Sequence, residues 1–266
     1  MSKGNLFTLK SRSNSAGSIA SISRAMNLVS SAEYRVSKKL LFDADSYLKE
    51  LKEVVKNLNY RNFDGSKMFF IVFNSDKGFC GAYNNMVTKF FNNHISSLNQ
   101  SDFSNIEILS VGKKSPSSYV AEIQHSKIEG GNDIKKLSKR LGDRAFQEFQ
   151  SGSKLFLIYS EYSLSKGTPY IEEVLAIPNS NNSNIEYLIE PSSFEVSSFA
   201  IKEYIFATIY RALVSAKTSE HYTRMVSMKT ANDNAEDLIK ELKTAYNKER
   251  QAIITKEILE VIGGGC

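Results

Sequence analysis

The stretch from residue 19 to residue 41, IASISRAMNLVSSAEYRVSKKLL, carries the strongest fold signal in the chain. Its apolar residues recur at alternating steps of three and four, which places them in one stripe along a helix. The stripe, which Glu33 interrupts at a seam position, comprises Ile19, Ile22, Met26, Val29, Val36 and Leu40. After a shift of one residue it resumes as Leu41, Ala44, Leu48, Leu51, Val55 and Leu58. The pattern predicts one coiled-coil helix from about residue 9 to about residue 58, roughly 75 Å long.

The C-terminal segment predicts a second long helix. Proline, the residue that most reliably ends a helix, occurs in this sequence only between residues 116 and 191. The apolar positions beyond it are Ile205, Ile209, Ala212 and Ala216, followed after a polar middle by Ala235, Leu238, Leu242, Ala245, Ala252 and Leu259. We expect a helix from about 203 to 262, near 90 Å long. Ser219 and Thr223 weaken its seam, which fits either an outer face that meets partners or a loosely packed coil.

The middle of the chain follows an α/β pattern. Apolar runs of strand length lie at 68–74, 106–111, 155–159 and 170–177, with another near Tyr187, and helical patterns run through 89–91 and 132–150. The remaining residues form a domain too small to bury two such long helices, so we expect these to pair antiparallel and to project from it. The predicted fold is α/β plus coiled coil: an antiparallel coiled coil of long N- and C-terminal helices with an inserted Rossmann-like α/β domain. The expected domains are 1–60, 61–200 and 201–266.

Charge and cysteine content narrow the class of protein. The formal net charge is +5, and residues 1–42 hold seven Lys or Arg against a single acid, Glu33. Such a basic segment is typical of contact with nucleic acid, an anionic membrane surface or an acidic protein, or is a solvated face. Cys80 and Cys266 are too few for a disulfide framework. Neither a membrane-spanning run nor a signal peptide is evident, so we expect a cytosolic address.

Residues that would support catalysis do not form a recognisable pattern. His94, His125 and His221 lie far apart in the sequence and lack metal-ligand spacing, and no phosphate-binding glycine motif occurs. We therefore expect no catalytic, cofactor or metal residues. The segment 75–81, SDKGFCG, is either a tight turn with Cys80 as a small buried residue or a ligand site, and its glycine spacing favours the turn.

Two further motifs point to a family. The run SDKGFCGAYN, 75–84, resembles the S-D-R-G-L-C-G-G-L-N signature of the gamma subunit of F-type ATP synthases. The run 219–255, SEHYTRMVSMKTANDNAEDLIKELKTAYNKERQAIIT, is similar to that family's C-terminal pattern nearly throughout. The segments at 24–29 and 187–191, YLIEP, also resemble the family, whereas 92–150 diverges from its pattern.

The resemblance implies a mechanical role. In that family the terminal helices form a coiled coil inside a ring of three alpha and three beta subunits, and the α/β domain touches the epsilon subunit and the membrane c ring. Rotation driven by ion flow carries the beta subunits through their catalytic cycle. The implied function is therefore a non-catalytic rotor shaft without cofactors, peripheral on the cytoplasmic face of a bacterial inner membrane. The coupling ion, proton or sodium, is chosen in the c ring.

The resemblance also assigns contact residues by position. The implied beta-subunit contacts are Met26, Lys77, Glu220, Arg224, Arg250, Gln251 and Thr255, and the implied contacts with the c ring and epsilon subunit are Tyr187 and Glu190. Met26 also fits a simple seam position. Glu33 departs from the family, which has Lys there, and Lys77 replaces an Arg.

Two other classes remain open at this point. A Rossmann-like enzyme with helical extensions would bind nucleotide, and the absent phosphate loop counts against it. A coiled-coil nucleic-acid binder would show steep salt-dependent binding. Residues 201–266 hold ten basic and nine acidic side chains, a balance that counts against the second class.

Overall fold

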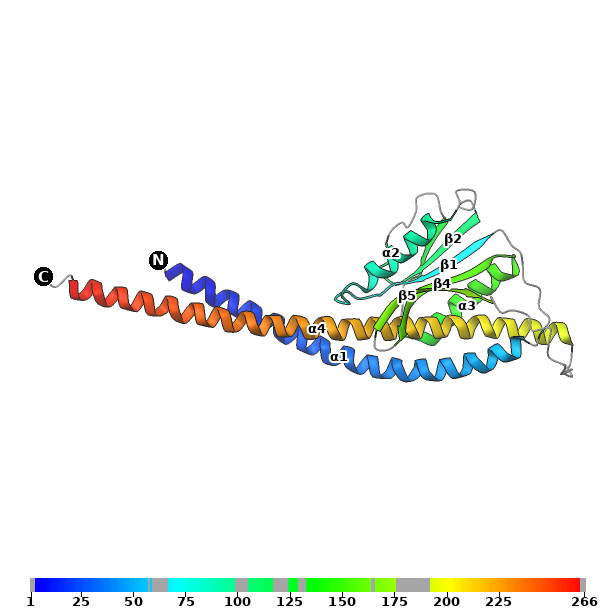
Figure 1. Cartoon of the computed structure of the whole chain (residues 1–266), viewed down its shortest axis with the longest axis horizontal. Coiled ribbons are helices and arrows are strands. Elements are labelled where there is room, and N and C mark those ends of the chain that lie inside the picture. Colours follow the sequence, from blue (N-terminus) through cyan, green and yellow to red (C-terminus); the bar gives the residue numbers. More distant parts are fainter. Residues whose placement is uncertain are drawn as a thin grey trace. The chain divides into compact units, whose positions relative to one another are not determined.

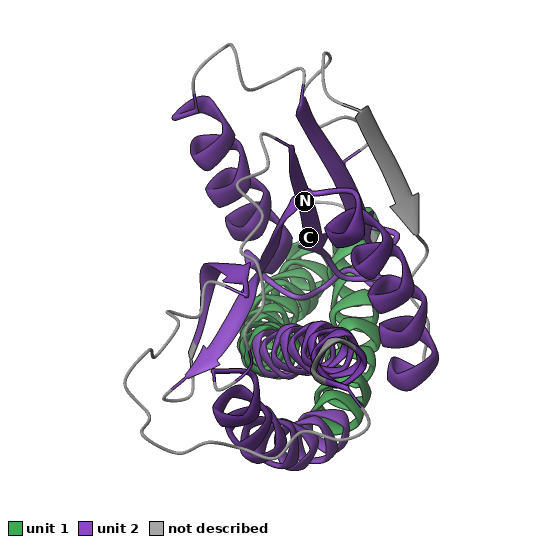
Figure 2. Cartoon of the chain, turned by 90° about the vertical axis from the view of Figure 1, so that its right-hand side faces the viewer, with its two compact units in different colours: residues 1–30, 224–266 green, residues 31–223 purple. Residues whose placement is uncertain are grey.

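The computed structural model describes residues 3–56, 58, 67–98, 105–116, 124–128, 133–163, 166–175 and 192–263 (Figure 1). In chain order the elements are α1 (Lys3–Lys56), β1 (Met68–Phe73), α2 (Tyr83–Ser96), β2 (Ile106–Val111), β3 (Gln124–Ile128), α3 (Ile134–Gln150), β4 (Lys154–Ser163), β5 (Lys166–Val174) and α4 (Ser193–Gly263). The chain forms two compact units, one of residues 1–30 with 224–266 and one of residues 31–223 (Figure 2). Both long helices contribute residues to both units.

The sheet of the unit 31–223 has the strand order β3-β2-β1-β4-β5. β1 runs parallel to β2 and β4, β2 runs parallel to β3, and β5 pairs antiparallel with β4. In the central register Phe70 faces Ile108 on one side and Phe156 on the other. A largely parallel sheet has to be covered on both faces, and its central strands are accordingly apolar throughout.

Each face of the sheet has its own apolar core. On one face, Phe70 and Val72 pack with the buried side of α2, which includes Val87 and Phe91. On the other, Ile71 and its neighbours pack with α3, with Val55 of α1 and with residues of α4 from Ala200 to Ala216. The part of the two long helices in this unit is therefore core structure, and the predicted Rossmann-like domain flanked by helices is confirmed.

The predicted elements agree with the structure to different degrees. The strands at 68–74 and 106–111 are β1 and β2 within one residue, and the helix at 132–150 is α3. β4 is longer than predicted, and β5 begins and ends earlier. β3 was not predicted, because its sequence QHSKI lacks an apolar run. The strand expected near Tyr187 and the proposed tail residue Cys266 lie outside the described residues.

The long helices run antiparallel beside each other within each unit. In the unit of residues 1–30 and 224–266, Asn5 Nδ2 donates to Glu249 Oε1 at 3.3 Å, and Arg24 pairs with Glu236 at 2.6 Å. In the unit 31–223, Glu33 pairs with His221 at 3.0 Å, and Asp45 pairs with Arg211 at 2.8 Å. The partner numbers fall as the α1 numbers rise, which confirms the antiparallel pairing.

The predicted seam in the first half of α1 is wrong. Ile19, Ile22, Val29 and Val36 are all more than half exposed, whereas the buried positions are Ala16, Ala20, Ser23, Ser30 and Ser37. Their spacings are four, three, seven and seven, the steps of a heptad repeat, so they form a seam of their own one position away from the apolar stripe. Small side chains let two helix backbones approach closely. From Leu41 onward the prediction is correct, with Leu41, Ala44 and Val55 buried.

The seam of α4 follows the prediction only in part. The first four predicted positions, from Ile205 to Ala216, are buried, as are Ala235 and Leu242. Leu238 and Leu259 are exposed. Ser219 is fully buried, and its hydroxyl shares a hydrogen bond of 2.7 Å with the Ser160 hydroxyl of β4. The seam is therefore polar at Ser219 because this residue contacts the sheet. Neither an outer face that meets partners nor a loosely packed coil, the two interpretations drawn from the sequence, included this contact.

Candidate partner-contact site

The turn at 75–81 is closed by its own side chains. Asn84 at the start of α2 accepts from the Ser75 backbone N–H at 2.9 Å and donates to Ser75 Oγ at 2.8 Å. Ser75 Oγ in turn donates to the Lys77 carbonyl at 2.8 Å. Cys80 is 3% exposed, so it is the small buried residue that the sequence predicted.

The two glycines of this turn play different roles. Gly81 has φ of 56°, a left-handed conformation that glycine adopts without steric cost. A Cβ added at Gly78 would meet nothing within 4 Å, so no close approach requires a glycine there. The close approach occurs instead at Gly112, after β2, where a Cβ would lie 2.3 Å from the Asn74 carbonyl oxygen.

Lys217 bridges the turn and α4, the two segments in which the family resemblance selected Lys77 and Glu220. Its ammonium group lies 3.5 Å from Asp76 Oδ2, next to Lys77 in the turn, and 3.0 Å from Glu220 Oε2 on α4. Glu220 is 3% exposed and Lys77 is exposed. Sequence reasoning missed Lys217, although its spacing of three from Glu220 on a predicted helix is the ion-pair signal that would have found it.

Met26 and Arg224 lie in paired segments of the unit 1–30 with 224–266. Asn27, next to Met26, donates its side-chain amide to the Met225 carbonyl at 2.7 Å, which brings the two positions onto neighbouring helix turns. Met26 is partly buried, in keeping with the seam position that the sequence left open. Arg224 is 3% exposed, so most of its side chain is held by its own chain.

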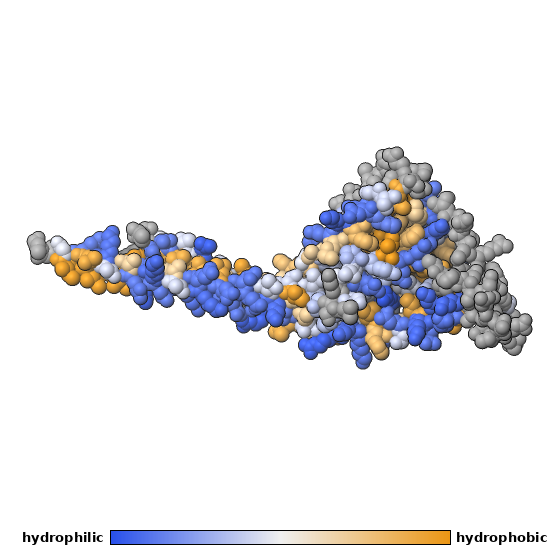
Figure 3. Space-filling view, in the orientation of Figure 1, coloured by the Kyte–Doolittle hydropathy of each residue, from blue (hydrophilic) through white to orange (hydrophobic). Residues whose placement is uncertain are grey.

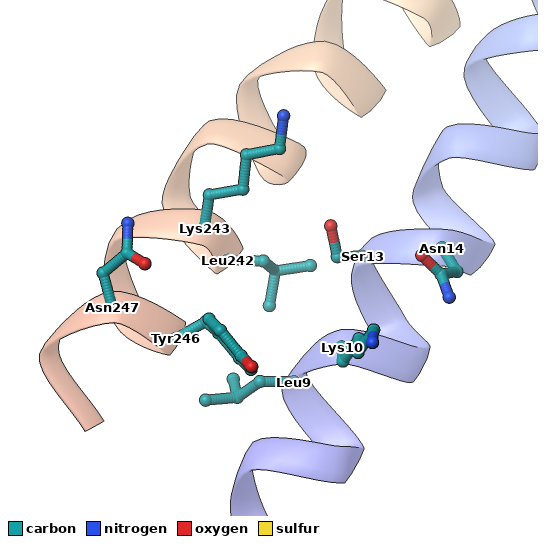
Figure 4. A pocket seen from close by; sticks show the side chains of 8 residues that line it. All are labelled: Leu9, Lys10, Ser13, Asn14, Leu242, Lys243, Tyr246 and Asn247. Carbon is teal, nitrogen blue, oxygen red and sulfur yellow. The ribbon is translucent and has the colours of Figure 1, made fainter. Parts of the chain in front are cut away.

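Arg250, Gln251 and Thr255 form a separate exposed group on α4. They lie about 40 Å along the helix from Arg224, at 1.5 Å per residue. Just before them the two helices enclose a hollow of about 310 Å³. Figure 4 shows Leu9 and Leu242 pointing into this hollow, whereas Lys243 points away from it.

Neither His94 nor His221 belongs to a group of side chains that could hold a metal ion within the described part of the structure. Among the described residues, no group of His, Cys, Asp and Glu is arranged to hold a metal ion. His221 pairs with Glu33, so the acid that interrupts the apolar stripe has a partner on α4. Burial lowers the pKa of His94. The side chain of His125 lies outside the described part of the structure, as do Tyr187 and Glu190, the two residues assigned to the c ring and epsilon subunit.

The strongest charge cluster of the unit 31–223 ties both long helices to the sheet. Arg211 of α4 pairs with Asp45 of α1 at 2.8 Å and with Glu161 of β4 at 2.9 Å, and it also donates to the Tyr159 hydroxyl. That hydroxyl donates to Glu172 of β5 at 2.8 Å. Burial raises the pKa of Glu172 and of Tyr159. Burial lowers the pKa of Arg211, but Tyr159 and the bonds to the two acids more than offset this, so the pKa is raised.

The geometry thus presents contact surfaces and a stiff framework. No helix in the described ranges has an apolar stretch long enough to cross a bilayer. The exposed candidates are Lys77 on the turn and Arg250, Gln251 and Thr255 on α4. Surfaces of this kind suit binding to other proteins more than chemistry within the chain.

Comparison with known proteins decides the family. The family model described as ATP synthase matches residues 5–265. The ATP synthase gamma chain of Clostridium botulinum is 30% identical over 283 residues, covering 99% of this chain and 98% of the relative. The chain belongs to the ATP synthase gamma chain family. A second gamma chain, from Polynucleobacter asymbioticus, is 29% identical over 97% of each sequence.

Solved structures support the gamma-chain fold. A chain in the rotor of the Euglena gracilis mitochondrial ATP synthase matches with a TM-score of 0.70 and 15% identity, covering 95% of this chain and all of that one. A chain from the central stalk and c-ring structure of the Tetrahymena thermophila enzyme matches with a TM-score of 0.62 and 17% identity, over 79% of this chain and 99% of that one. At these identities the likeness establishes the fold, and the family rests on the sequence matches.

Proposed function

We propose that this chain is the central rotor shaft of an F-type ATP synthase, which couples ion flow through the membrane c ring to conformational cycling of the catalytic beta subunits. The observation that carries the proposal is the family match over nearly the whole chain, which also covers nearly the whole of a gamma-chain relative. A gamma chain is a non-catalytic rotor subunit, and the chemistry of ATP belongs to its partners.

The proposed partners are three alpha and three beta subunits, the epsilon subunit and the c ring. The chain is part of the F1 sector, and we place it at the cytoplasmic face of a bacterial inner membrane because the relatives named above are bacterial. The domain limits 1–60, 61–200 and 201–266, and the extension of the paired helices beyond the α/β domain, stay predictions. Small-angle scattering of the purified chain tests that extension.

The beta-subunit contacts fall into two groups in this proposal. Lys77, Arg250, Gln251 and Thr255 are exposed and meet the partner directly. Met26, Glu220 and Arg224 are partly or largely buried, so they act through the few atoms that reach the surface and through the neighbours that they hold in place. Tyr187 and Glu190 are the proposed contacts with the c ring and epsilon subunit.

A charged rotor surface suits weak contact with a partner subunit at each angular position in turn. An exposed Lys or Arg against an acidic partner loop contributes about 0–1 kcal/mol while solvated, and the attraction grows as the contact loses water. Contacts of this strength guide the partner at each angular position without stopping rotation. A rotor also needs a rigid joint between its helices and its sheet. Within the unit 31–223, the Arg211 cluster supplies this joint.

Assembly tests the proposal. Co-expression with the alpha and beta subunits of the same organism is expected to give a complex with three copies of each and one copy of this chain. If the chain never enters such a complex, the rotor function is wrong.

Charge reversal tests the contacts. Arg250→Glu is expected to lower the ATPase rate of the assembled complex several-fold, whereas Lys248→Glu, at an exposed position two residues away, leaves it within about twofold. Arg224→Glu is also expected to lower the rate, and thermal unfolding of the isolated variant separates a contact effect from loss of fold, because Arg224 is buried. Equal rates for Arg250→Glu and Lys248→Glu would remove Arg250 from the contact set.

A further inference from the structure

Three tyrosines from three elements meet in the unit 31–223. They are Tyr34 of α1, Tyr162 of β4 and Tyr222 of α4, and each is partly buried. The ring centroids of Tyr34 lie 5.6 Å from those of both other tyrosines, and the centroids of Tyr162 and Tyr222 lie 5.7 Å apart. The rings meet edge-on or tilted, as aromatic pairs prefer, so the three side chains form one closed group.

Two of the three rings also share a hydrogen bond. The hydroxyl oxygens of Tyr34 and Tyr162 lie 2.5 Å apart, and either hydroxyl can be the donor. Burial, together with this hydrogen bond, raises the pKa of Tyr34 to about 12. The phenol therefore keeps its proton at neutral pH, so the hydrogen bond holds the two hydroxyls together under ordinary conditions.

The backbone around the three tyrosines is held from two sides. The Tyr162 backbone N–H donates to the Ser215 hydroxyl of α4 at 3.0 Å. The residues that precede the other two tyrosines, Glu33 and His221, pair at 3.0 Å. Because the elements are fixed to one another in this way, a reaction between two of the rings needs no further ordering of the chain.

Phenol rings held together can be joined by oxidation. Removal of one electron from a tyrosine, with its phenolic proton leaving to water, gives a neutral phenoxyl radical. Its unpaired electron is shared between the oxygen and the ring carbons next to the hydroxyl-bearing carbon. Two such radicals join through one of these carbons on each ring, and the hydrogen on each joined carbon then moves to the oxygen of its own ring. The sum is the loss of two electrons and two protons and the gain of one carbon–carbon bond.

We propose that Tyr34 and Tyr162 form an oxidative cross-linking site, at which a small one-electron oxidant joins the two rings as dityrosine and links α1 covalently to β4. The shared hydrogen bond brings the two hydroxyls, and with them the reactive ring carbons beside them, next to each other. A pair held in this way reacts at an effective concentration far above that of tyrosines on separate molecules. The reaction needs no partner subunit, so it is independent of the rotor function.

The chain contains a second tyrosine pair that serves as a matched comparison. Tyr159 and Tyr170 also meet edge-on, with ring centroids 5.7 Å apart. The hydroxyl proton of Tyr159, however, is donated to Glu172, and Arg211 donates to the same oxygen. If ring proximity alone selects the reacting pair, both pairs are cross-linked. If the shared hydroxyl bond selects it, only the pair of Tyr34 and Tyr162 is.

The test oxidises the dilute, purified full chain with a ruthenium(III) polypyridyl complex, generated by light in the presence of persulfate. The monomer is then isolated and digested for mass spectrometry. The expected product is a pair of peptides linked through Tyr34 and Tyr162, lighter by two hydrogen atoms than the two peptides together. The chain has no tryptophan, so the fluorescence of dityrosine also reports its formation.

Phenylalanine variants separate the reacting pair from its surroundings. Tyr34→Phe and Tyr162→Phe are each expected to abolish the linked peptides, because phenylalanine forms no phenoxyl radical. Tyr222→Phe and Tyr47→Phe, the latter at a tyrosine of α1 that is 51% exposed, are expected to leave the yield within about twofold, because each keeps its ring. Circular dichroism before oxidation checks that every variant is folded.

The linked monomer is also expected to resist unfolding. The new bond joins residues 128 positions apart in the sequence, so it restricts the unfolded chain and raises the urea concentration at the midpoint of unfolding. The proposal is overturned if the oxidised wild-type monomer contains no link between Tyr34 and Tyr162. It is also overturned if Tyr159 and Tyr170 are linked in equal or greater yield, or if the linked monomer unfolds at a lower urea concentration than the unlinked one.

Discussion

At the scale of single residues, Arg211 is the centre of a partly buried charge cluster in the unit 31–223. One guanidinium group meets two carboxylates and a tyrosine hydroxyl from two elements, α1 and β4. A buried charge that loses its partner destabilises a fold strongly, whereas a fully bonded cluster fixes the geometry of the groups around it. The cluster therefore sets the position of α1 and α4 on the sheet within this unit more than it adds net stability.

Glu172 gives this cluster a pH dependence. Because burial raises its pKa above the ordinary value of 4.5, ionisation disfavours the folded state. The stability contributed by the protonated form is complete below pH 4.5 and is lost as the pH rises through the raised pKa. Gln keeps an acceptor for the Tyr159 hydroxyl without a charge. Urea unfolding is expected to show Glu172→Gln gaining stability relative to the wild type as the pH rises above 4.5.

The control for this prediction is Glu173→Gln, one position further along β5, where the side chain is exposed. Its stability difference from the wild type is expected to stay flat over the same pH range. If the Glu172→Gln difference is equally flat, the Arg211 charge compensates the buried carboxylate fully, and the stated direction of the pKa is wrong.

Two glycines in helices are expected to respond to alanine in opposite directions. At Gly142 of α3 a Cβ would lie 2.0 Å from the Phe206 ring, so Gly142→Ala is expected to cost about 1–3 kcal/mol through overpacking. At Gly17 of α1 nothing lies within 4 Å of such a Cβ, so Gly17→Ala is expected to gain about 0.5–1 kcal/mol from helix propensity. Chemical denaturation measures both, and equal signs would contradict the packing described for α3.

At the scale of elements, the apolar stripe of α1 shows how far a sequence pattern reaches. Heptad-like spacing correctly predicted a long helix, but it could not say which face meets α4. The chain buries Ala20 and Ser23 and exposes Ile19 and Ile22, because small residues permit close helix approach and because the apolar face is left for other contacts. Periodicity predicts that the helix has an apolar face. The size of the residues beside that face decides which face packs within the chain.

The difference in burial between the apolar stripe and the small-residue seam of α1 yields a direct test. Ile22→Ser is expected to change the free energy of unfolding by less than about 0.5 kcal/mol, since the side chain is 61% exposed. Ala20→Leu, at a position 5% exposed, is expected to cost about 1–3 kcal/mol by forcing the helices apart. If Ile22→Ser lowers the free energy of unfolding by more than about 2 kcal/mol, the apolar stripe is the seam, as the spacing alone suggested.

The candidate site was predictable to a similar degree. The family motifs selected Lys77 and Glu220 separately. The structure connects their segments through Lys217, which contacts Asp76 and Glu220 and which only the fold could place beside the turn. Phe79 stands in the quoted motif, yet the sequence gives no sign of its left-handed backbone. β3 was not predicted because its segment has weak strand character on its own. It forms a strand because it pairs with β2.

At the scale of the whole molecule, the exposed apolar surface indicates that partner proteins cover part of this chain. The last turns of α4 expose a row of large aliphatic side chains, visible as hydrophobic surface at the end of that helix in Figure 3. These residues are Ile254, Ile258, Leu259, Val261 and Ile262. Contiguous apolar surface of this kind in a soluble chain marks a protein-binding site or an aggregation hazard.

The isolated chain is therefore expected to self-associate through the end of α4. Ile258 and Ile262 lie four residues apart on one helical face, so the double change Ile258→Lys with Ile262→Lys places two charges in the middle of the row. Sedimentation velocity across a dilution series is expected to show concentration-dependent species for the wild type and a single monomeric species for this variant.

The matched control for self-association is Phe199→Lys, which adds a charge at a residue 71% exposed near the other end of α4. If Phe199→Lys suppresses association as strongly as the double variant, net charge is the cause and the apolar row is not. If the wild type is monomeric at every concentration, the exposed aliphatic side chains are too few to drive association. A change confined to the double variant assigns the end of α4 as the surface that partner subunits have to cover.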